Sequence, residues 1–150
     1  MDSQRNIIRS FKDLEVFQKS YKLSVEMLTQ VVPLLPKEEK YDLGDQLSRS
    51  SKAIPRLIAE GYGKRHQKRG FQKYLDDAIS ESNETQVGMM HVKDLYYKYV
   101  DPKLSERLIS KYDILSRQIY MLRKSWRGFD KSSKSISKPN PASKPFDKLL

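Results

Sequence analysis

Hydrophobic residues recur along the chain at steps of three and four, the spacing that places side chains on one face of an α-helix. The first stripe comprises Leu14, Phe17, Tyr21, Val25, Leu28, Val32 and Leu35. It predicts a helix over residues 13–32 that turns this face to the core. Pro33 and Pro36 then end the pattern, because proline lacks an amide donor and obstructs the preceding turn.

A second stripe predicts a helix over residues 38–60. Its members are Leu43, Leu47, Ile54, Ile58 and Tyr62. Pro55 lies inside it and is expected to kink the helix, because it removes one backbone donor. We expect Gly61 and Gly63 to stop the helix, and Glu60 to accept hydrogen bonds from Arg49 or from amides near the kink.

The third and fourth stripes predict two long helices. The third, over residues 68–99, carries Phe71, Leu75, Ala78, Ser82, Thr85, Met89, Val92, Tyr96 and Tyr99. Asp101 followed by Pro102 marks the next start, because an aspartate caps free amides and proline suits the first helical position. The fourth stripe carries Leu104, Leu108, Tyr112, Leu115, Ile119, Leu122 and Trp126, and its helix is expected to end near Gly128.

These elements predict an all-α fold. No segment alternates polar and apolar residues in the manner of a strand, and short connections between long helices make neighbours antiparallel. We therefore expect an antiparallel up-down four-helix bundle over residues 1–127. Residues 128–150 are rich in serine, lysine and proline and predict a disordered basic tail.

The helices are more apolar than one core face requires. The additional apolar residues are Val16, Leu23 and Met27 in the first helix, Val87, Met90 and Tyr97 in the third, and Ile109, Ile114, Tyr120 and Met121 in the fourth. A second apolar face on several helices predicts burial against further copies of the chain, hence a homo-oligomer. The alternative is a scatter of ordinary surface hydrophobes.

The chain is basic, with 29 Lys and Arg against 19 Asp and Glu and a formal charge of +10. Residues 128–150 hold five Lys and two Asp, so about +7 remains on residues 1–127. Such a potential attracts polyanions, namely RNA, DNA or an acidic protein face. The alternative is that the excess lysine only keeps the protein soluble.

The sequence offers little for catalysis. Cysteine is absent, which excludes disulfides and thiolate chemistry. Neither His66 nor His91 belongs to a Glu-x-x-His motif of the kind that carboxylate di-metal bundles require. Phosphate-binding glycine loops are lacking too. We expect no enzyme, no cofactor and no metal, and the lack of a signal-peptide or membrane-span pattern predicts a soluble cytoplasmic protein.

The densest basic cluster lies between the second and third helices. It comprises Lys64, Arg65, Lys68 and Arg69, with Lys73 one turn further along. Basic side chains beside a helix amino end suit phosphate, because the free backbone amides there also favour anions. The sequence therefore predicts a nucleic-acid contact here, and a solvated loop is the alternative.

Three further basic residues, Arg49, Lys52 and Arg56, recur at steps of three and four along one face of the second helix. They are candidates for a secondary nucleic-acid patch. The alternative is that they pair with acidic residues of a neighbouring copy, such as Asp76, Asp77 or Glu81.

Four segments resemble the family of 23S rRNA intervening sequence proteins. Residues 11–19 are similar to its opening F-x-D-L-x-V-W-Q-K, with Phe17 in place of the usual Trp. Pro36, Glu39, Leu43, Gln46, Leu47 and Arg49 follow P-x-x-E-x-x-x-L-x-x-Q-L-x-R. Residues 54–64 resemble the hallmark I-P-x-N-I-A-E-G-x-G-R, with Leu57 in place of Asn. Phe71, Leu75, Ala78 and Glu84 match a later motif.

The resemblance implies an up-down bundle that assembles as a ring, since pentamers are known in the family. Some members are encoded within intervening sequences of ribosomal RNA genes. Relatives are basic accessory proteins of the reverse transcriptases of diversity-generating retroelements.

Two functions follow as hypotheses. The first is a non-enzymatic bundle that associates with nucleic acid, RNA before DNA, or assists a nucleic-acid enzyme such as a reverse transcriptase. The alternative is a structural or protein-interaction module that binds an acidic protein partner without nucleic-acid contact. No membrane partner is expected.

Overall fold

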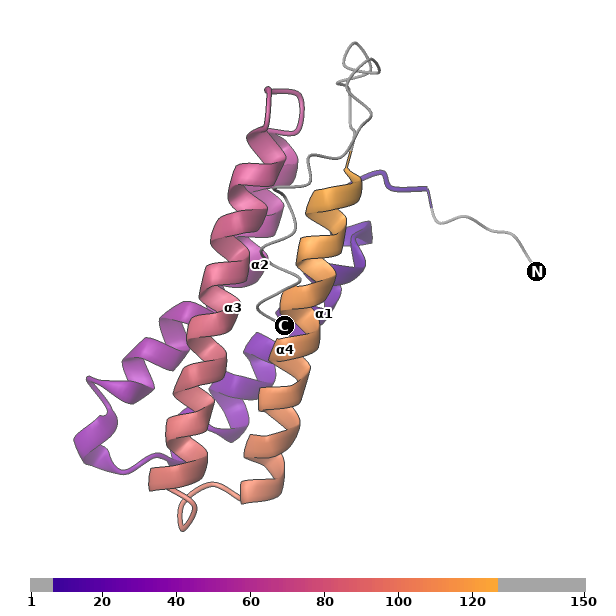
Figure 1. The fold of residues 1–150 in the computed structure, drawn as a ribbon. Coiled ribbons are helices and arrows are strands. Elements are labelled where there is room, and N and C mark those ends of the chain that lie inside the picture. The colour runs from indigo at the N-terminus through magenta and orange to yellow at the C-terminus, as the bar shows by residue number, and fades with distance from the viewer. Residues whose placement is uncertain (1–6, 127–150) are drawn as a thin grey trace, which may run out of the picture.

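The computed structural model describes residues 7–126, and this range holds four α-helices and no strand (Figure 1). The helices are α1 (Glu15–Gln30), α2 (Leu43–Gly63), α3 (Gly70–Leu95) and α4 (Pro102–Ser125). Single turns of 3₁₀-helix occur at Phe11–Asp13, Val32–Leu34 and Lys37–Glu39. The chain runs up and down through successive helices, which confirms the predicted four-helix bundle. The predicted tail, residues 128–150, lies outside the described residues.

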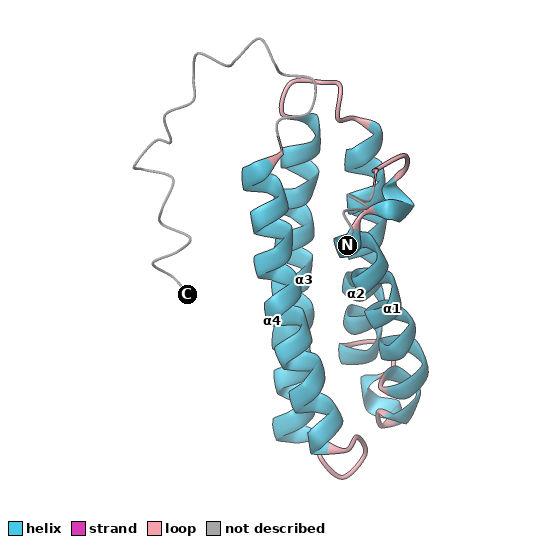
Figure 2. Ribbon diagram, turned by 90° about the vertical axis from the view of Figure 1, so that its right-hand side faces the viewer, coloured by secondary structure: helices cyan, strands magenta, loops and turns pink. Residues whose placement is uncertain are grey.

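The helices form two antiparallel pairs. Figure 2 shows α1 beside α2 and α3 beside α4. α2 packs extensively on both α1 and α3, and α3 on α4, whereas α1 and α4 touch far less. The bundle is therefore least closed along the α1–α4 seam. Within the described range, no helix combines the length and apolar character needed to span a bilayer.

Two helix ends differ from the predictions by a full turn or more, the start of the second helix and the end of the third. The second helix begins at Leu43 instead of residue 38, because Lys37–Glu39 form a 3₁₀ turn. The Glu39 carboxylate accepts hydrogen bonds from the Leu43 amide and from the Tyr96 hydroxyl. The third helix ends at Leu95 instead of residue 99. Tyr96 already belongs to the α3–α4 connection, and its hydrogen bond to Glu39 joins that connection to the one between α1 and α2. The fourth begins as predicted, with the Asp101 side chain accepting from the Lys103 amide at 3.0 Å.

The predicted core face of α1 is wrong. Tyr21 and Val25 are 55% and 45% exposed, and the buried residues are Val16, Ser20, Leu23, Ser24 and Met27. Ser20 and Ser24 donate to the carbonyl oxygens of Phe17 and Tyr21, so their hydroxyls can be buried at little cost. The helix is thus rotated by about 100°, one residue step, from its predicted orientation.

Pro55 is buried inside α2, and the helix continues past it to Gly63. Pro55 therefore does not break α2. A bend of the helix at Pro55 stays a prediction. Nearby polar side chains are satisfied inside the core. Ser51 donates to the carbonyl of Ser48, and Thr85 of α3 donates to the Ser50 hydroxyl at 2.8 Å. The Thr85–Ser50 pair is a buried polar link between α2 and α3.

Of the two glycines predicted to stop the second helix, Gly63 is its last residue, whereas α2 runs two residues beyond Gly61. The role of Gly61 is a close approach between helices: a Cβ built there would lie 2.5 Å from Tyr74 Cβ and 3.2 Å from the Phe71 ring of α3. Gly88 plays the same part near the other end of this interface, facing Leu47. The expected Glu60 bond to Arg49 is also absent, since Arg49 pairs with Asp45 at 3.2 Å.

Candidate nucleic-acid interface

The connection between α2 and α3, residues 64–69, folds back tightly on itself at the top of Figure 1. The Gln67 amide donates to the Lys64 carbonyl at 3.0 Å, and the Gly70 amide to the Gln67 carbonyl at 2.9 Å. A Cβ at Gly70 would collide with the Lys64 carbonyl oxygen. Arg69 adopts the left-handed conformation, with φ of 57°. The backbone thereby gathers the basic residues of the connection into a small space.

A cleft of about 490 Å³ opens between this connection, the first turns of α3 and the end of α4. Its lining residues are Lys64, Gln67, Lys68, Arg69, Gly70, Gln72, Lys73, Tyr74, Asp76 and Arg123. Four of the five basic residues predicted for this cluster are among them. The amino end of α3 adds to the positive potential, because no side chain caps it and its first turn holds no acidic residue.

Lys64 lies against an aromatic wall of this cleft. Its ammonium is 5.2 Å from the centre of the Tyr74 ring, a cation–π arrangement. A hydrogen bond with the Tyr74 side chain raises the pKa of Lys64, with smaller electrostatic contributions from Tyr74 and Glu60. The lysine is therefore fully charged at physiological pH.

Arg65 points elsewhere. Its guanidinium stacks 4.1 Å from the centre of the Tyr62 ring, and Nη1 donates to the Tyr62 carbonyl at 2.9 Å. It is absent from the residues that line the cleft. Because its donors already engage the end of α2, Arg65 is less available to a phosphate than Lys68 or Arg69.

Arg123 is a basic residue of the cleft that sequence reasoning missed. It reaches the site from α4, where its Nε donates to Asp76 of α3 at 2.5 Å. The sequence separates Arg123 from the connection by more than fifty residues, so no local pattern joined them. Its place at the end of a helix antiparallel to α3 was the signal that could have done so.

An aromatic cluster supports the cleft from below. The Phe71 ring meets Trp126 edge to face at 4.8 Å and Tyr62 at 5.9 Å. The Gln72 amide also donates to the Trp126 carbonyl. These contacts tie the ends of α2 and α4 to the start of α3, so the cleft is built on packed helix ends.

The second predicted patch is separate from this cleft. Arg49, Lys52 and Arg56 are exposed along the outer face of α2, and Arg49 is fifteen residues before Lys64, about 22 Å along a helix. Glu81 of α3 lies close by: burial, then Glu84, raises the pKa of this carboxyl, while Arg56 and Arg49 lower it. The stripe therefore sits beside acidic groups of its own chain.

Nowhere in residues 7–126 do three carboxylate or histidine side chains gather into a group that could hold a metal ion. Of the structural residues predicted, Pro55 and Gly61 are buried and Glu60 is exposed at the end of α2.

Comparison with known proteins gives one assignment. The family model described as 23S rRNA-intervening sequence protein matches residues 12–121. This span includes all of α1, α2 and α3 and most of α4, and thus both basic patches, but it ends before Arg123. A search of curated proteins found no match.

Proposed function

The chain belongs to the family of 23S rRNA-intervening sequence proteins, and we propose that it is a non-enzymatic bundle that binds the phosphate backbone of RNA through the cleft at the α2–α3 connection. The observation that supports this most is the convergence of Lys64, Lys68, Arg69 and Lys73 on one cleft at an uncapped helix amino end. Contacts to phosphate position a nucleic acid without reading its sequence. The protein would thus associate with RNA broadly, or hold it for a nucleic-acid enzyme such as a reverse transcriptase.

The proposal includes a homo-oligomeric ring, with five copies as the family resemblance suggests. Large hydrophobic side chains stand exposed on three helices, among them Tyr21 and Val25 on α1, Val87 and Met90 on α3, and Ile114 and Met121 on α4. Exposed apolar faces of this extent are typical of surfaces that bury against partners. A ring would repeat the basic cleft around one axis, and several weak phosphate contacts would then act together.

Filter binding of RNA across a salt series tests this function. Four phosphate contacts to a single strand predict a slope of log affinity against log salt of about −2.8. Single strands of different sequence should bind with similar affinity, because backbone contacts dominate. A slope near zero, or no retention of RNA at low salt, would refute RNA binding and leave the acidic-protein module as the function.

The assembly is tested separately by sedimentation equilibrium at micromolar concentration. We expect a single species larger than a dimer, with five copies as the specific expectation. A monomer across this range would exclude the ring without bearing on whether a single bundle binds RNA.

A further inference from the structure

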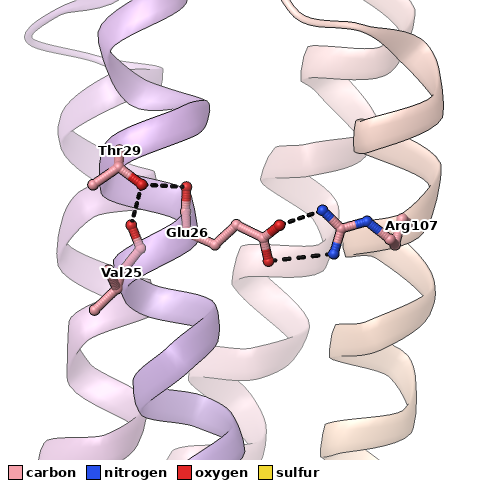
Figure 3. A network of polar contacts seen from close by, with 4 residues as sticks. All are labelled: Val25, Glu26, Thr29 and Arg107. Atoms are coloured by element: carbon pink, nitrogen blue, oxygen red, sulfur yellow. Dashed lines mark hydrogen bonds and ion pairs between the residues drawn. The ribbon is translucent and has the colours of Figure 1, made fainter.

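The α1–α4 seam contains a groove that the bundle does not fill. The groove has a volume of about 500 Å³ and lies in the seam that faces the viewer in Figure 2. At the lower end of the groove, the Arg107 guanidinium donates two hydrogen bonds to the Glu26 carboxylate (Figure 3), and we call this pair the clamp. Above this clamp the two helices are not bridged by any ion pair among the described residues.

The groove combines an apolar floor with a positive rim. Leu23 and Leu115 are buried beneath it, and Ile114 stands 49% exposed at its edge. Lys22 of α1 and Lys111 of α4 flank it from opposite sides. No carboxylate in the described part of the chain forms an ion pair with either lysine. The site therefore suits a helix that presents acidic residues around an apolar one.

This chain carries such a helix face itself. Asp77, Glu84 and Val87 follow one another along the outer surface of α3 at steps of seven and three, and all three are exposed. No ion pair within the described residues neutralises Asp77 or Glu84. Burial, followed by the charge of Glu84, raises the pKa of the neighbouring Glu81, while Arg56 of α2 lowers it.

We propose that the α3 ridge of one copy docks in the α1–α4 groove of the next. Lys22 and Lys111 would then face Asp77 and Glu84, and Val87 would pack on Ile114. The groove and the ridge lie on different helices of the same chain. When two copies dock, one therefore keeps its groove free and the other keeps its ridge free. A contact of this heterologous kind repeats from copy to copy and closes a ring when the rotation permits.

The inference rests on the proposed assembly, and it goes further by naming the surfaces and the charges that recognise one another. There are two competing outcomes: an acidic helix of another protein occupies the groove, or RNA phosphates do. In either case, substitutions in the α3 ridge should leave the oligomeric state of the protein unchanged.

Charge reversal on the full chain tests the contact by sedimentation. Lys22→Glu with Lys111→Glu should weaken self-association roughly a hundredfold, because like charges across an interface are strongly unfavourable. Asp77→Lys with Glu84→Lys should do the same from the other side. All four changes in one chain restore opposite charges and the native net charge, and should restore assembly.

Lys37→Glu with Lys98→Glu is the matched control, since it changes the net charge as much as the groove variant at sites outside both surfaces. It should assemble like the native chain. Far-UV circular dichroism checks that every variant folds. A native ring unaffected by both reversals would overturn the inference, and so would a failure of the fourfold variant to reassemble. A native monomer would overturn the proposed assembly and this contact with it.

Discussion

Gly61→Ala is expected to lower the free energy of unfolding by about 1–3 kcal/mol, although alanine is the better helix former. The added methyl group would lie 2.5 Å from Tyr74 Cβ. Both atoms are attached directly to helix backbones, so α2 and α3 would have to move apart. Their interface is the most extensive between any two helices of the described bundle. Urea unfolding followed by circular dichroism measures the change.

Gly63→Ala is the matched control for this prediction. It lies two residues further along α2, and a Cβ there meets nothing within 4 Å. Helix propensity is then the main effect, so this variant should be neutral or more stable by up to about 1 kcal/mol. Equal stabilities for the two variants would show that α2 and α3 tolerate a methyl group at their closest approach.

The second large effect is expected at the cleft. Replacing Lys64, Arg65, Lys68 and Arg69 with serine should weaken RNA binding roughly a hundredfold at low salt. It should also flatten the salt slope by about 0.7 for each phosphate that no longer meets a cation. Single strands of different sequence should be affected alike, because these side chains read no bases. Arg65→Ser alone should have the smallest effect of the four, since Tyr62 already engages that guanidinium.

A control variant separates this site from net charge. Lys37, Lys40, Lys98 and Lys103 lie at the opposite end of the bundle, on the connections and the first turn of α4. Their replacement with serine removes the same four charges. RNA affinity should fall far less than in the cleft variant, and equal decreases would show that binding follows overall charge with no particular site.

The number, order and approximate ends of the helices could be predicted from hydrophobic spacing, but not the orientation of α1. Its apolar residues occupy two adjacent faces, and spacing alone does not choose between them. Ser20 and Ser24 read as polar positions in the sequence, yet they can be buried because their hydroxyls bond to carbonyls of their own helix. The face predicted as core, with Tyr21 and Val25, is consequently the exposed one.

The candidate site could be predicted only in part, for a similar reason. A run of basic residues in one connection is visible in the sequence, and four of the five predicted members do line the cleft. The contribution of Arg123 depends on tertiary packing, and so does the diversion of Arg65 to Tyr62. Gly61 likewise has the sequence position of a local terminator, whereas its missing side chain serves a contact with the helix that follows.

The central claim is that the folded bundle itself binds RNA. The five lysines of residues 128–150 also attract phosphate and would obscure the result. The most direct measurement is therefore a salt series of RNA binding by a chain that ends at Gly128. We expect binding at low salt with a slope of about −2.8, reduced by serine at the four positions of the connection. No binding by this chain at low salt would contradict the account and assign the basic surface to protein contacts.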